Sequence, residues 1–93
     1  MVYLDYSATT PVNTEVLDTY NKVVLNYIGN PNSLHRLGTE SKNLIDEATA
    51  QIKHLLKTNK EVIYTSGSSE SNNLVIKGIC NKYKNRGNHI ITS

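Results

Sequence analysis

The sequence has no tryptophan and no phenylalanine, so its six tyrosines supply all of the aromatic volume. It has a single cysteine, Cys80, which excludes an internal disulfide and suits a reducing compartment. No apolar run approaches the ~20 residues that a membrane-spanning helix needs, and the first residues show neither a basic region nor a cleavage site. We therefore expect a cytoplasmic protein that does not enter a membrane.

Charge of either sign is scarce, and the two signs nearly balance. Ten Lys and Arg against eight Asp and Glu leave a net charge of +2, and the basic residues are scattered, so nucleic-acid binding has no support. The three histidines, His35, His54 and His89, lack the spacing of metal ligands. We expect no metal site. With 38% hydrophobic residues in 93, the chain holds one domain at most.

Two amphipathic helices are predicted in the first 60 residues. The first is capped by Asn13 or Thr14 and ends at Gly29. The second is longer, and its N-cap is either Thr39 or Ser33. Apolar residues at helical spacing form one face of this second helix: Leu37, Leu44, Ile45, Ala48, Ile52, Leu55 and Leu56.

Short strands are predicted at 2–5, 61–65 and 89–92, because these segments alternate in polarity or are rich in β-branched residues. A helix that stops near Asn85 separates the last two strands. A strand, a crossover helix and a second strand within about 33 residues favour a βαβ unit and the α/β class. The thiol of Cys80 falls inside this helix, where a small buried side chain is the expectation rather than a nucleophile.

The loop between the predicted strand at 61–65 and that helix carries the clearest chemical signal. Backbone N–H groups and the positive end of the helix dipole gather at such a point and favour an anion. Gly67 would let the backbone come close, while the Ser68 and Ser69 hydroxyls can donate to phosphate oxygens. The alternative is an ordinary serine N-cap with Glu70 near the helix start. Neither a Walker A loop nor GxGxxG is present.

Four motifs, taken together in order and spacing, resemble the N-terminal part of the pyridoxal-phosphate-dependent cysteine desulfurases. They are YLDYSATTP at 3–11, GNPNSLH at 29–35, YTSGSSESNNL at 64–74 and HIITS at 89–93. The resemblance is closer to the branch that supplies sulfur for iron–sulfur clusters and tRNA thiolation than to the selenocysteine-lyase-like branch.

The resemblance implies a type I aminotransferase-like fold, the fold of PLP-dependent transferases, in a homodimer. Residues 1–12 would form an N-terminal arm on the small-domain side of the active site. Residues 13–93 would begin the large α/β domain that binds the cofactor, and the chain looks truncated after Ser93. In that fold the strands at 61–65 and 89–93 are parallel but not neighbours, so this chain would leave their edges unpaired.

The resemblance also assigns site residues. The segment that matches Ser68 and Ser69 binds the phosphate of pyridoxal 5′-phosphate (PLP), which is where the helix start already suggests an anion. The family usually has Gly or Ala followed by Thr here, and Ser69 keeps the hydroxyl donor. Ala8, Thr9 and Thr10 would lie near the substrate entrance, in the substrate pocket. The loop of His35 would shape the wall of the active site.

The activity implied is the conversion of L-cysteine to L-alanine and an enzyme persulfide, whose sulfur passes to an acceptor or scaffold protein. None of Lys77, Lys82 and Lys84 matches the lysine that binds the cofactor, and Cys80 does not match the persulfide cysteine. We therefore expect no catalytic residue in this chain and no activity from it alone. Two alternatives stay open: another class V aminotransferase or PLP-dependent lyase, and a small non-catalytic dimerisation or binding protein.

Overall fold

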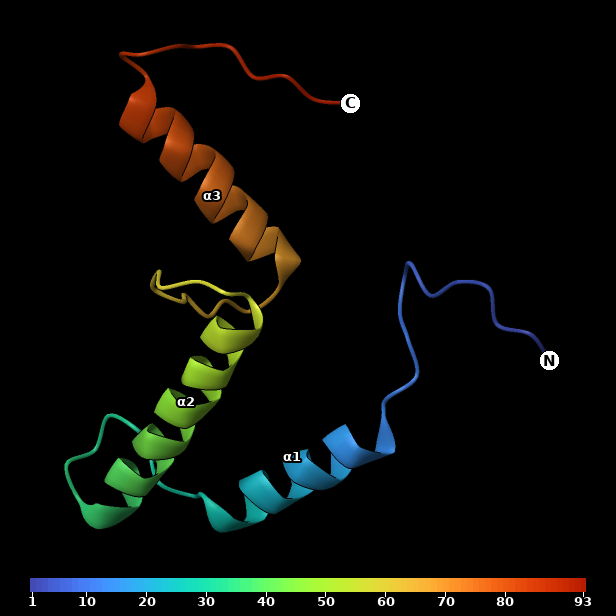
Figure 1. The fold of residues 1–93 in the computed structure, drawn as a ribbon, viewed down its shortest axis with the longest axis vertical. Coiled ribbons are helices and arrows are strands. Elements are labelled where there is room, and N and C mark those ends of the chain that lie inside the picture. The colour runs from blue at the N-terminus through green and yellow to red at the C-terminus, as the bar shows by residue number, and fades with distance from the viewer. The chain divides into compact units, whose positions relative to one another are not determined.

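A computed structural model describes all 93 residues and contains three α-helices (Figure 1). Helix α1 spans Thr14–Asn26, α2 spans Arg36–Leu55 and α3 spans Ser68–Tyr83. The chain divides into two units: Met1–Asn59, which holds α1 and α2, and Lys60–Ser93, which holds α3. Each unit is described by itself.

Helix α1 begins at one of its two predicted caps. The Oδ1 atom of Asn13 accepts hydrogen bonds from the N–H of Glu15 at 2.8 Å and of Val16 at 3.4 Å, which satisfies two of the free donors at the helix start. The helix ends at Asn26, so the predicted end at Gly29 is wrong. Gly29 has no positive φ and instead lies against the backbone at the start of α2.

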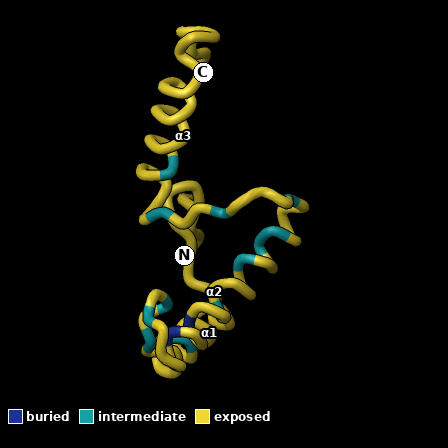
Figure 2. Tube along the Cα trace, turned by 90° about the vertical axis from the view of Figure 1, so that its left-hand side faces the viewer, coloured by how far each residue is buried: buried dark blue, intermediate teal, exposed yellow.

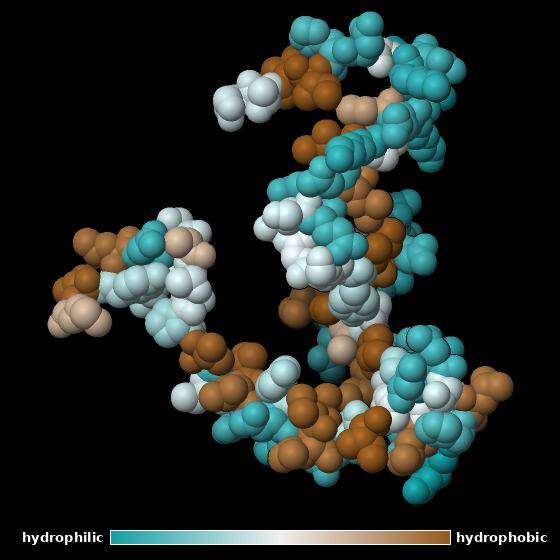
Figure 3. Space-filling model, turned by 180° about the vertical axis from the view of Figure 1, so that it is seen from behind, coloured by the Kyte–Doolittle hydropathy of each residue, from teal (hydrophilic) through white to brown (hydrophobic).

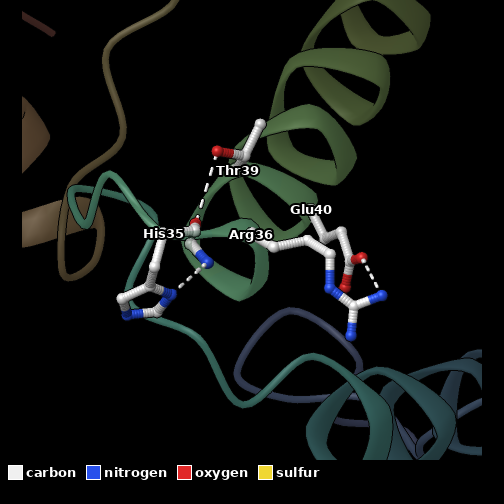
Figure 4. Close-up of polar contacts among 5 residues, drawn as sticks. His35, Arg36, Thr39 and Glu40 are labelled. Carbon is white, nitrogen blue, oxygen red and sulfur yellow. Dashed lines mark hydrogen bonds and ion pairs between the residues drawn. The ribbon is translucent and has the colours of Figure 1, made fainter.

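Helix α2 begins after His35, and both predicted caps are wrong. The unprotonated Nδ1 of His35 accepts a hydrogen bond from the N–H of Gly38 at 3.3 Å (Figure 4). Thr39 lies one turn too late to cap the helix, and its N–H and hydroxyl donate to the His35 carbonyl. Ser33 lies too early, because its N–H donates to the Asn30 carbonyl and closes a turn.

Helix α3 begins with Ser68, after Gly67 in an extended conformation and without any side-chain N-cap. The alternative of an ordinary serine N-cap is therefore wrong. The helix ends at Tyr83, close to the end predicted near Asn85. Cys80, on this helix, is exposed, which corrects the expectation of a buried thiol.

The three predicted strands are not formed. Residues 2–5, 61–65 and 89–92 have no regular secondary structure, and the structure contains no strand at all. The partial βαβ unit is therefore absent and only its helix is present. A strand depends on backbone hydrogen bonds to a neighbour, and the family resemblance implies that two of these segments are not neighbours in the sheet. β-Branched composition alone does not supply that partner.

No large apolar side chain is buried in this chain. Figure 2 shows that nearly all residues are exposed or half-buried, and the two buried ones are Gly38 and Ser41 of α2. Figure 3 shows apolar side chains open to the surface at several places. The helices therefore rest on their own hydrogen bonds and caps rather than on a shared core. None of them is both long and apolar enough to cross a bilayer.

Candidate functional site

The loop before α3 is held first by an acidic side chain. The Oε2 atom of Glu70 accepts two hydrogen bonds from Ser66, from its hydroxyl at 2.6 Å and from its backbone N–H at 2.8 Å. Bonds to the ionised form favour that form, so the Ser66 hydroxyl, followed by the Ser66 amide, lowers the pKa of the Glu70 carboxyl below its usual 4.5. The exposed Glu70 is thus tied to the residue before the helix cap.

A second set of bonds holds the same loop through hydroxyl groups. The Thr65 hydroxyl donates to the Gly67 carbonyl at 3.1 Å, so the Ser71 hydroxyl is the donor in the 2.6 Å bond between Ser71 and Thr65. The Ser71 N–H also donates to the Gly67 carbonyl at 3.1 Å, which makes the first turn of α3. Both Thr65 and Ser71 are half-buried. The loop is therefore fixed at each end.

Several donors at this helix start remain without a protein acceptor. The N–H groups of Ser68, Ser69 and Glu70 precede the first helical hydrogen bond and donate to no protein atom. The hydroxyls of Ser68 and Ser69 are exposed on the same turn. Free amides, hydroxyls and the positive end of the helix dipole form a donor set for an anion such as a phosphate. A Cβ on Gly67 would meet nothing within 4 Å, so folding of the loop does not require glycine there.

The predicted substrate-pocket residues of the arm are exposed and lie at or directly after a turn at 6–8. The Asp5 carbonyl accepts from the N–H of Ala8 at 3.1 Å and of Thr9 at 3.3 Å. The Tyr3 hydroxyl donates toward the carbonyls of Asp5 and Thr9, each 3.1 Å away. Thr10 follows directly and is exposed. Backbone bonds to Asp5 thus hold Ala8 and Thr9 together, and Thr10 is next to them in the chain.

His35 occupies a different place, at the start of α2. Its Nδ1 caps the helix, and the next residue, Arg36, makes an exposed ion pair of 3.7 Å with Glu40 one turn along (Figure 4). No hydrogen bond joins His35 to the arm at 1–12. The side chain is therefore fixed by its own helix.

Comparison with known proteins identifies the family. The sequence model of the family described as aminotransferase class-V matches residues 2–93. The chain belongs to the aminotransferase class-V family. Membership of the class-V family implies the fold of PLP-dependent transferases, which confirms the coarser part of the fold prediction. The partial βαβ unit is not part of what is confirmed.

Individual relatives within the class-V family carry the name cysteine desulfurase IscS. Over 93 residues the chain is 44% identical to the protein of that name from Rickettsia massiliae. The alignment covers 98% of this chain and 23% of the relative. It is 44% identical over 93 residues to the protein of that name from Dictyoglomus turgidum, and the alignment covers 99% of this chain and 24% of the relative. It is 48% identical over 99 aligned residues to the protein of that name from Buchnera aphidicola subsp. Baizongia pistaciae, and the alignment covers 98% of this chain and 24% of the relative.

The chain thus spans about a quarter of the length of the curated relatives that it matches. No solved structure matches it. The resemblance to cysteine desulfurases in the four motifs is confirmed by these class-V relatives.

Sequence reasoning missed the hydrogen bonds that fix the loop. The sequence indicates Glu70 only as an acidic residue near a helix start and does not predict its bonds to Ser66. The signal was the spacing, since a serine four residues before a glutamate at a helix start is close to a capping box. The hydroxyl pair of Thr65 and Ser71, six residues apart, has no comparable sequence signature.

Proposed function

We propose that this chain supplies the phosphate-binding side of a PLP-dependent cysteine desulfurase. The enzyme converts L-cysteine to L-alanine and an enzyme persulfide, and an acceptor protein takes the sulfur for iron–sulfur clusters or tRNA thiolation. The proposal is supported by the family and by the names of its relatives. The observation that carries it is the donor set at the start of α3, where three amides have no protein acceptor.

The residues of the loop fit the phosphate of PLP. A phosphate dianion needs several donors and no free negative charge beside it. The amides of Ser68 and Ser69 and their hydroxyls supply donors, and the one carboxylate of this turn, on Glu70, is engaged by Ser66. The open space over Gly67 leaves room for phosphate oxygens to approach the backbone. The donors of the loop therefore fit a phosphate, and the one negative charge beside them, on Glu70, is directed toward Ser66.

Within such an enzyme this chain binds and orients rather than transfers groups. PLP, when bound, draws electrons from the substrate and so weakens bonds at its α-carbon. The Ser69 hydroxyl donates a hydrogen bond to the phosphate, and the Ser68 hydroxyl is a second donor. The dipole of α3 offsets the negative charge of the phosphate. Ala8, Thr9 and Thr10 line the substrate entrance, and the loop of His35 forms part of the wall. None of these residues acts as acid, base or nucleophile.

The wider organisation belongs to the same proposal. Residues 1–12 form the arm and residues 13–93 begin the large domain, within a cytoplasmic homodimer. The lysine that holds PLP and the cysteine that carries the persulfide have no counterparts among Lys77, Lys82, Lys84 and Cys80, so the 93 residues alone do not catalyse the reaction. The lack of any buried large apolar side chain counts against the alternative of a small independent binding protein.

The test is the affinity of the gene product, at its native length, for PLP and for pyridoxal, which lacks the phosphate. We expect PLP to bind more tightly than pyridoxal, and Ser69→Ala to raise the Kd of PLP by about three- to tenfold, as loss of one hydrogen bond to a charged group would. Thr14→Ala is the matched control, because it removes a hydroxyl from the first turn of α1.

Two outcomes would contradict the proposal. An unchanged Kd in Ser69→Ala would remove the phosphate assignment. Release of a product other than alanine and sulfur from L-cysteine would favour the other class V aminotransferases or PLP-dependent lyases.

A further inference from the structure

The phosphate loop contains a feature that electrostatics alone would disfavour. Glu70 is the third residue of α3, beside the amides proposed to hold the phosphate. A free carboxylate there would compete with the phosphate for those amides and would repel it. A carboxylate at this position is therefore compatible with phosphate binding only if it makes a favourable contribution that outweighs this competition and repulsion.

The geometry shows where the carboxylate is directed instead. It passes over the helix cap, Gly67, and binds the hydroxyl and the N–H of Ser66. In an ordinary capping box the glutamate binds the N–H of the cap residue itself. Here the bond lies one residue earlier, and the amides of Ser68 and Ser69 stay free for another acceptor.

We propose that Glu70 is a positioning residue for the phosphate of PLP: by holding Ser66, it fixes the chain that enters α3 so that the amides of Ser68 and Ser69 meet one anion together. This inference rests on the proposed function of the loop. The hydroxyl bond between Thr65 and Ser71 joins the residues on either side of the Ser66–Glu70 bond, so the donors between them are ordered before the ligand arrives. Ordering in advance lowers the entropic cost of binding.

The charge state of Glu70 suits this role. Its pKa is lowered by the two bonds from Ser66, so the carboxylate is ionised at neutral pH and both bonds are charge-assisted. Both donors of Ser66 are then used by Glu70 and do not contact the phosphate. Glu70 thus touches neither the ligand nor the reacting atoms.

The two possible roles of Glu70 predict opposite signs. If its carboxylate only lies nearby, its removal relieves repulsion, and PLP binds equally well or more tightly. If it positions the loop, its removal lets the segment before α3 move, and PLP binds more weakly although a negative charge has gone. Glu15, an exposed acidic residue in the first turn of α1, is the matched control.

The experiment measures the Kd of PLP, pyridoxal and inorganic phosphate for the gene product at its native length. For Glu70→Ala we expect the Kd of PLP to rise about tenfold, that of inorganic phosphate to rise, and that of pyridoxal to stay unchanged. Amide hydrogen exchange of residues 66–70 should accelerate in the unliganded protein. For Glu70→Gln, which keeps the shape of the side chain, the Kd of PLP should lie between that of the unsubstituted protein and that of Glu70→Ala. Glu15→Ala should leave every one of these values unchanged.

If Glu70→Ala does not fold, Ser66→Ala tests the same role of Glu70, because it removes the hydroxyl bond and retains the amide bond. We expect it to raise the Kd of PLP by about threefold. An unchanged or lower Kd in both variants, with Ser69→Ala still weakening PLP, overturns the role of Glu70 and leaves the proposed function intact. Equal affinity of the unsubstituted protein for PLP and pyridoxal, with Ser69→Ala inert, overturns the proposed function and this inference with it.

Discussion

A Cβ placed on Gly29 would lie 2.7 Å from the backbone nitrogen of Gly38, and one placed on Gly38 would lie 2.6 Å from the carbonyl oxygen of Asn30. The two glycines thus bring the loop at 29–33 and the first turn of α2 into contact, backbone against backbone. Neither has a positive φ. Their lack of a side chain is required for space, and no flexible side chain is available to move aside.

Alanine at either position should therefore destabilise the protein. We expect Gly38→Ala to cost about 1–3 kcal/mol, because the new methyl group overlaps backbone atoms that cannot move independently. Urea unfolding of the gene product at its native length measures this cost. Gly87→Ala is the control, since a Cβ there meets nothing within 4 Å. Equal midpoints for the Gly38 and Gly87 variants would contradict the close approach.

Removing the imidazole of His35 should weaken the start of α2. His35→Ala loses the bond to the Gly38 N–H, and loss of an N-cap typically costs about 1 kcal/mol. His35→Asn should recover most of that loss, because an amide oxygen can accept the same bond. His54→Ala, at an exposed position on the same helix, is the control. If asparagine were no better than alanine, His35 would not be acting as a cap.

The bonds of Glu70 predict a dependence of stability on acid. The folded pKa lies below its usual value of 4.5, so the folded state releases the proton more readily than the unfolded state. Stability from this group is fully present above the unfolded pKa and disappears as the pH falls through the lowered folded pKa. The difference in unfolding midpoint between the native sequence and Glu70→Gln should thus be largest near neutral pH and vanish in strong acid. A difference independent of pH would refute the bond.

Gly67 offers a contrast with the first pair of glycines. A Cβ at Gly67 has open space around it in the loop, and its backbone is extended. Gly67→Ala should leave the unfolding midpoint nearly unchanged but raise the Kd of PLP, because the methyl group would occupy space that phosphate oxygens use. Thermal unfolding without ligand and PLP titration of the same variant separate the two effects. A loss of stability equal to that of Gly38→Ala would assign Gly67 to folding instead.

The sequence predicts the helices well because their signals are local. The Oδ1 atom of Asn13 and the spacing of apolar residues behind it determine where α1 begins without reference to the rest of the chain. The start of α2 was missed because histidine is not among the preferred cap residues, and an imidazole nitrogen accepts a bond only in its unprotonated form.

Features that depend on distant partners were harder to predict. Residues 61–65 have the composition of a strand, but a strand forms only beside another, and composition does not reveal whether a neighbour is present. The sequence does predict that Ser68 and Ser69 lie at a helix start, since a glycine between serines after an apolar run marks such a turn. The bonds of Glu70 and of Thr65 around them depend on side-chain rotamers, which sequence patterns do not specify.

The absence of a buried large apolar side chain has a thermodynamic consequence for these 93 residues. The heat capacity of unfolding scales with the apolar surface newly exposed to water, and here little is hidden beforehand. Heating this polypeptide alone should give a broad, shallow loss of helical signal in place of a sharp calorimetric peak, with each helix fraying from its ends. A cooperative transition therefore requires that other parts of a folded protein cover the exposed apolar side chains of these helices.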